Sequence, residues 1–156
     1  MSNLYTYGAI NTNAGTNSFF SLDYSLCNYD FSGLYITGLC FEEVKRGDIL
    51  YFNKTWMAWG KSNAKSFNTM PSKGLALTDC LATYDCPILI YGKFNNPNWN
   101  FNLTLDRTIY TSPYTSGYCL TSTYDIPDTY REPIGVAISQ TQGQFHFYGL
   151  WMYNFV

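Results

Sequence analysis

Short apolar runs separated by turn residues follow one another along most of this chain. Each run is rich in β-branched or aromatic side chains, and each is closed by Gly, Pro, Asn, Asp or Ser. The runs cover residues 47–53, 74–79, 87–92, 108–112 and 133–139. This pattern is typical of β-strands and leaves almost no room for a helix, so the sequence predicts an all-β fold.

Polar turns recur between these runs. The clearest cover residues 95–100, 113–117 and 125–128. Trp56 and Trp59 follow the first run after a short polar segment, which predicts a hairpin whose return strand carries both rings. An offset of three places them on opposite faces of a strand. Turns about every ten residues favour an antiparallel β-sandwich or barrel of short strands.

A change of composition near residue 45 divides the chain into two parts. Residues 1–45 are rich in Asn, Ser, Thr, Gly and Tyr, with strand-like segments at 18–23 and 33–38 and a turn at 11–15. We expect this part to be strand-poor, an amino-terminal arm or strand layer, and residues 46–156 to form the β domain. Two interpretations of the first part stay open: an arm that joins a neighbouring subunit, or edge strands of the same domain.

The composition suits a protein that meets other subunits. A chain of 156 residues with 46% hydrophobic and 13% charged residues is enough for one domain with a substantial core. Aromatic residues make up 19%, and 15 of them are Tyr. Because a tyrosine can bury its ring while its hydroxyl stays in water, this content favours sheet surfaces and subunit interfaces.

The charge distribution argues against two classes of partner. The net charge is −2, and the basic residues are spread among neutral ones, so we expect no nucleic-acid partner. No apolar run approaches the roughly 18 residues of a membrane span, so we expect no membrane insertion. The first residues lack the basic and apolar segments of an export signal, which favours synthesis in the cytoplasm.

The five cysteines are an odd number in a chain without a visible export signal. This favours reduced thiols that act as small buried apolar groups. Cys80 and Cys86 are closest in sequence and flank a predicted loop. A disulfide between them stays open, although the expected reducing site of synthesis argues against it.

Few residues have the arrangement that catalysis requires. His146 is the only histidine and lies in an alternating aromatic strand, and its candidate nucleophiles Cys119 and Ser139 have no local signature. One histidine and scattered cysteines do not make a zinc site. We therefore expect a protein that is not an enzyme, with no catalytic residue, no metal and no cofactor.

Carbohydrate chemistry is the remaining alternative. A glycoside hydrolase needs two facing acids, but most acids here lie in predicted turns, where Asp bonds the backbone, so this alternative is the weakest. Carbohydrate binding without catalysis has candidate contacts in Trp56, Trp59 and Trp99, with Trp151 or nearby tyrosines as further candidates. The competing interpretation, which we favour, is that these are core and interface aromatics.

The order of the motifs between residues 45 and 148 resembles a β domain of tailed-bacteriophage fibre and capsid-decoration proteins. The motifs are residues 47–53 with Trp56, 71–77, 88–92, 99–102, 109–112 with 117–121, and 133–139. The resemblance implies a virion component without enzymatic activity, usually a homotrimer. Gly74, Gly92, Gly117 and Gly135 match glycine positions of that domain, and we expect them to be structural, in turns or bulges.

Only about 45 residues precede the resembling region, fewer than a long fibre shaft needs. The resemblance then favours a capsid-decoration or head-fibre subunit on the particle surface, with copies of itself and the major capsid protein or other virion proteins as partners. A tail-fibre or receptor-binding module for a host-surface glycan is the alternative. The aromatic segment 148–156 is expected to dock as a final strand or in a subunit contact. Candidate interface residues are Phe19, Phe20, Leu34, Tyr35, Trp151, Tyr153 and Phe155.

Overall fold

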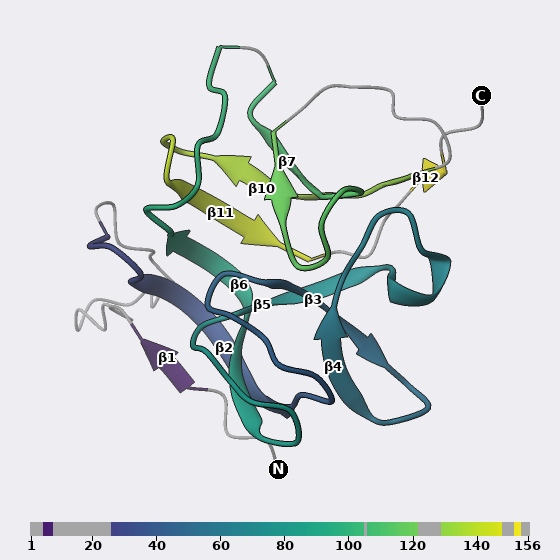
Figure 1. Ribbon diagram of the computed structural model, residues 1–156. Coiled ribbons are helices and arrows are strands. Elements are labelled where there is room, and N and C mark those ends of the chain that lie inside the picture. Colours follow the sequence, from purple (N-terminus) through teal and green to yellow (C-terminus); the bar gives the residue numbers. More distant parts are fainter. Residues whose placement is uncertain (1–4, 8–25, 105, 122–128, 148–151, 154–156) are drawn as a thin grey trace, which may run out of the picture.

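The computed structural model describes residues 5–7, 26–104, 106–121, 129–147 and 152–153, and it is almost entirely β (Figure 1). The prediction of an all-β, antiparallel fold is confirmed. The strands are β1 (Tyr5–Tyr7), β2 (Phe31–Leu39), β3 (Ile49–Asn53), β4 (Ala58–Lys61), β5 (Ser72–Ala76), β6 (Asp85–Asn95), β7 (Thr108–Thr111), β8 (Cys119–Leu120), β9 (Tyr130–Arg131), β10 (Pro133–Ala137), β11 (Gln142–His146) and β12 (Met152–Tyr153). A single 3-10 turn, η1 (Phe67–Thr69), interrupts them within the described residues.

Strand β6 organises the sheet. One of its edges pairs with β2 along its whole length. Its other edge pairs first with β5 and then with β11. The main path runs β4-β3-β5-β6-β11-β10-β7-β8 and curls into a half-barrel. In Figure 1, β7, β10 and β11 therefore lie above β6, while β3, β4 and β5 lie beside it.

The part of the sheet that contains β2 to β6 closes on itself. The residue after β2, Cys40, forms a bridge to Trp59 in β4, and the Phe41 N–H donates to the Trp59 carbonyl at 3.0 Å. Strands β2, β6, β5, β3 and β4 thus form a small ring. It encloses a buried cluster of Cys40, Val44, Leu50, Trp59, Ala76, Cys80, Cys86 and Ile88.

A second core lies on the opposite side of the middle strands. It consists of Ile49, Leu75, Leu77, Leu89, Phe94, Phe101, Ile109, Ile134, Ala137 and Phe145. Successive residues of β3, β5 and β6 point to opposite faces and so enter different cores. Because both faces of these strands are buried, their sequences are continuous apolar runs instead of alternating ones.

The amino-terminal part contributes to the same sheet. Strand β1 pairs antiparallel with β2, which in turn pairs with β6. The expected strand at 33–38 lies within β2, whereas the segments at 11–15 and 18–23 lie outside the described residues. In this chain β1 and β2 are therefore strands of the same sheet as the predicted β domain.

The first hairpin forms as expected, with one correction. Strands β3 and β4 pair with Asn53 opposite Ala58, and the turn between them contains Trp56. The return strand therefore carries Trp59 alone, because the chain needs four residues to reverse. Trp59 is buried at 7% exposure and Trp56 is exposed at 61%, so the two rings do differ in environment.

The four glycines of the resemblance occupy different settings. Gly117 lies in a turn with a positive φ of 82°. Gly74 and Gly135 lie in strands β5 and β10, beside shifts of strand register. Gly92 lies in the middle of β6, directly opposite Gly33 of β2. No helix in the described part of the chain is long and apolar enough to cross a membrane.

Candidate functional site

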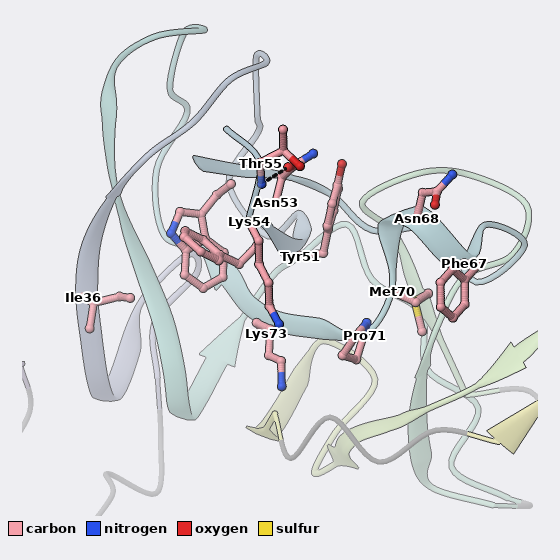
Figure 2. A pocket seen from close by; sticks show the side chains of 12 residues that line it. Ile36, Tyr51, Asn53, Lys54, Thr55, Phe67, Asn68, Met70, Pro71 and Lys73 are labelled. Carbon is pink, nitrogen blue, oxygen red and sulfur yellow. Dashed lines mark hydrogen bonds between the residues drawn. The ribbon is translucent and has the colours of Figure 1, made fainter. Parts of the chain in front are cut away.

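A cleft of about 1130 Å³ opens between two loops of the small ring formed by β2, β6, β5, β3 and β4 (Figure 2). One wall is the β3–β4 turn, and the other is the segment around η1. The floor is made by side chains of β2, β3, β4 and β5. The lining residues are Ile36, Tyr51, Phe52, Asn53, Lys54, Thr55, Trp59, Phe67, Asn68, Met70, Pro71 and Lys73.

Hydrogen bonds hold the first wall in place. The Asn53 Oδ1 atom accepts from the backbone N–H groups of Thr55 at 2.9 Å and Trp56 at 3.2 Å. Asparagine favours turns because its side chain can bond the backbone in this way. Met57 then adopts a left-handed φ of 50° and returns the chain into β4. The turn is thereby held in one conformation, although Trp56 and Met57 are exposed at 61% and 68%.

The second wall is tied to the body of the protein. The Thr69 hydroxyl accepts from the Asn63 N–H at 3.2 Å and donates to the Asn63 carbonyl at 3.0 Å. The Ala64 N–H donates to the Ser112 carbonyl at 3.1 Å, and the Ala64 carbonyl accepts from the Tyr130 N–H at 2.7 Å. The loop that carries Phe67 is therefore closed on itself through Thr69 and tied to β9 and to the residue after β7 through Ala64.

Phe67 presents its ring at the mouth of the cleft. The side chain is 62% exposed, and its ring lies 6.0 Å from the ring of Tyr130. Below it, Met70 and Pro71 continue the apolar wall, joined by a cis peptide bond. Trp59 and Tyr51 also line the cleft, each less than a tenth exposed. The cleft is thus apolar at its base and open to solvent above.

The charges that line the cleft are all positive. Lys54 is exposed and Lys73 is half-buried, and no carboxylate lies among the lining residues. Neither lysine forms an ion pair with a described carboxylate. Figure 2 shows Lys54 reaching down from the hairpin turn toward Lys73. A cationic cleft is unexpected in a chain with a net charge of −2.

A buried carboxyl group lies behind the cleft floor. The Ser72 N–H donates to Glu132 Oε2 at 2.8 Å, and Ser72 Oγ lies 2.7 Å from Thr111 Oγ1. Glu132 is fully buried, and its Oε1 atom has no hydrogen-bond partner within the described ranges. Burial raises the pKa of Glu132 to about 7, against the opposing effects of the bonds from Ser72 and the charge of Lys73.

The sequence predicted neither the cleft nor the buried carboxyl group of Glu132. Glu132 is one acid among several near a turn, and only its place directly before an apolar strand hints at burial. The cleft joins loops whose closeness depends on how β3 and β5 pair. The signal that sequence reasoning could have used is the cluster of lysine, asparagine and aromatic residues between 51 and 73.

The structure separates the three tryptophans that were candidate glycan contacts. Trp56 packs edge-on against Phe41 at 4.7 Å, and Trp59 lies in the floor of the cleft. Trp99 is half-buried against Phe94 and lines a different, smaller hollow of about 270 Å³. They do not form one binding platform.

The structure describes three of the seven candidate interface residues. Leu34 and Tyr35 lie half-buried in β2, and Tyr35 packs edge-on against Phe31 at 5.6 Å. Tyr153 lies in β12, which pairs with β9 and so forms a last strand. Phe19, Phe20, Trp151 and Phe155 lie outside the described residues.

The cysteines are present as free thiols. Cys80 and Cys86 each place their sulfur 3.8 Å from the Thr78 carbonyl oxygen, close together but not bonded to each other. Burial raises the pKa of Cys80 to about 11, and a hydrogen bond with Cys40 raises the pKa of Cys86. Groups of three potential metal ligands are not found among the described residues.

We expect one of the five thiols to react much faster than the others. Cys27 is exposed, whereas burial raises the pKa of Cys119 and the other three cysteines lie in the ring core. A chromogenic disulfide reagent at about pH 8 should therefore label one thiol per native chain quickly and all five in concentrated denaturant. The Cys27→Ser variant should lose the fast phase. Two or more fast thiols would contradict this arrangement of the core.

The fold and the cleft define a small antiparallel β protein with a cationic, apolar cleft between two fixed loops. No family model, curated protein or solved structure matches the chain. The function proposed below therefore depends on the residues of this chain.

Proposed function

We propose that this chain is a structural protein of a bacteriophage particle, a capsid-decoration or head-fibre subunit that acts by binding and assembly and not by catalysis. The order of its sequence motifs supports the virion role. The observation that carries the binding role is the exposure of Trp56, Met57 and Phe67 on two hydrogen-bonded loops.

Exposed large apolar side chains occur in many places on the surface. Tyr29, Leu39, Trp56, Met57, Phe67, Leu81, Tyr84, Tyr114, Tyr118, Val136 and Ile138 are all at least 36% exposed. Single exposed apolar residues are normal, but tryptophan, tyrosine and methionine are enriched where proteins meet. The exposed tryptophan, tyrosine and methionine residues lie on loops between the strands, where they suit contacts with other subunits of a particle.

The proposed mechanism is burial of this surface against copies of the chain and against the capsid. Apolar burial contributes roughly 25 cal/mol per Å² before ordering costs, and a stable interface buries roughly 1,600 Å². Such an interface can hold a particle component without covalent links. A carbohydrate-binding module is a weaker candidate, because the three tryptophans that would carry it lie apart.

We expect the purified chain to form trimers and to be found on the surface of virus particles. Light scattering after size exclusion should give about three times the chain mass of 17.9 kDa. Cryo-electron microscopy of the virus that encodes the chain should show it outside the capsid shell. The Trp56→Ser/Met57→Ser double variant should assemble more weakly, while Thr37→Ser, an exposed strand position, should not. A stable monomer that is absent from the particle would contradict the proposal.

A further inference from the structure

We propose that the cleft between the β3–β4 turn and η1 binds an acidic peptide segment of a partner protein. An apolar side chain of the segment would lie on the floor, and a neighbouring carboxylate would lie between Lys54 and Lys73. This inference names the kind of partner in the proposed function, and its assembly role depends on that function. The binding itself is tested separately.

The lining suits a peptide side chain better than a sugar. Ile36, Met70 and Pro71 are aliphatic, and Phe67 closes the mouth from one side. A sugar needs several polar groups that fix its hydroxyls. The Asn53 Oδ1 atom already accepts two backbone N–H groups, so it is occupied. Methionine adapts its shape to different apolar partners, which suits a protein-binding groove.

The lysine charges of the cleft favour a negatively charged peptide segment. Lys73 is half-buried on the cleft floor and Lys54 extends toward it, without a carboxylate on the lining. Two like charges near an apolar floor repel a basic segment and attract an acidic one. Glu132 does not line the cleft; it accepts from the Ser72 N–H behind the floor, and burial raises its pKa to about 7, so the carboxyl is largely protonated below that pH.

The cleft is ready to bind without rearrangement. The Asn53 side chain holds one wall, and Thr69, with the backbone bonds of Ala64, holds the other. A preformed groove loses little conformational entropy when a segment enters it. This favours a short extended segment that orders on a fixed surface, a common form of peptide recognition.

The test is a selection of random dodecapeptides on the immobilised full-length chain, followed by fluorescence anisotropy with the enriched peptide. We expect enriched sequences with Asp or Glu next to Leu, Phe or Met. Lys73→Glu should weaken the affinity for the enriched peptide at least about tenfold. The control Lys65→Glu changes an exposed lysine of the loop before η1 that does not line the cleft, and it should have no such effect.

A second pair of variants separates the apolar contact from the charge. Phe67→Ala should weaken binding of the peptide severalfold, whereas Tyr114→Ala, at a similarly exposed position outside the cleft, should not. Circular dichroism melting of each variant verifies that it is folded. No consensus, a basic consensus, or equal effects of Lys73→Glu and Lys65→Glu would overturn the inference. Binding of oligogalacturonate without any peptide consensus would also overturn it, in favour of an acidic saccharide.

The two proposals can fail independently. A chain that sits on the particle but enriches no acidic peptide keeps its virion role and loses this cleft function. A chain that binds the peptide through Lys73 but is absent from particles keeps the cleft function and loses the virion role.

Discussion

At about pH 8 the Glu132→Gln variant is expected to be more stable than the wild type, with a free energy of unfolding roughly 1 to 3 kcal/mol higher. Glu132 is completely buried, and one of its carboxyl oxygens has no partner within the described residues. Keeping a charge there is unfavourable, because burial removes the water that would stabilise it. Glutamine keeps an oxygen for the Ser72 N–H and carries no charge at any pH.

The direction of the pH dependence follows from the pKa of Glu132. Folding raises this pKa from 4.5 to about 7, so the folded chain holds its proton more tightly than the unfolded chain. Stability is therefore highest below about pH 4.5 and falls as the pH rises to about 7, after which this contribution is constant. Over that interval the loss is of the order of 3 kcal/mol.

Urea unfolding of both proteins at several pH values between about 4.5 and 8 measures this effect. His146, whose pKa is lowered by burial, contributes in the opposite direction in both proteins and cancels in the difference. Asp85→Asn, at an exposed position of β6, is the control and should keep the wild-type pH dependence. If Glu132→Gln loses stability with pH as steeply as the wild type, the carboxyl is not the buried group that the structure describes.

The burial of Glu132 shows where sequence reasoning fails. A run such as Pro133-Ile-Gly-Val-Ala predicts a strand, because β-branched residues bounded by turn residues favour extended backbone, and β10 lies there. The residue before such a run is equally compatible with solvent or core. Its burial depends on β5 and on Thr111 of β7, which are distant in sequence.

The middle strands show the opposite case. The runs at 47–53, 74–79 and 87–92 predicted β3, β5 and β6 because the residues between their bounding turn residues are apolar and do not alternate with polar ones. The same property hides which face of each strand enters which core, since there is no alternation to read. The branching of the sheet at β6, and with it the position of the cleft, therefore could not be predicted from local pattern.

The candidate tryptophans failed for a related reason. Trp56 and Trp59 are close in sequence, but the turn that reverses the chain exposes the first and buries the second. Trp99 follows the end of β6 and packs on the other core. The residue types indicated that the chain had aromatic side chains available for binding. Which of these side chains lines a cleft depends on the strand pairing, which the residue types do not reveal.

Gly92→Ala is expected to destabilise the protein by roughly 4 kcal/mol or more, which is comparable with the whole stability of a typical domain. Gly92 of β6 lies opposite Gly33 of β2, and a Cβ atom on Gly92 would overlap the Ser32 carbonyl oxygen and lie 2.7 Å from the Gly33 Cα. Its φ of 143° is also a conformation that L side chains rarely adopt. The obstructing atoms belong to the backbone, so no side chain can move aside.

The effect of Gly92→Ala is large because β6 is shared by both cores. Separating β2 from β6 at this point displaces Phe94 on one side and Ile88 on the other. The soluble yield and the urea midpoint of the variant should both fall sharply. Thr37→Ala, an exposed position of the same strand pair, should change stability by less than about 1 kcal/mol. A Gly92→Ala variant that unfolds within about 1 kcal/mol of the wild type would show that β2 and β6 do not approach as closely as this glycine pair requires.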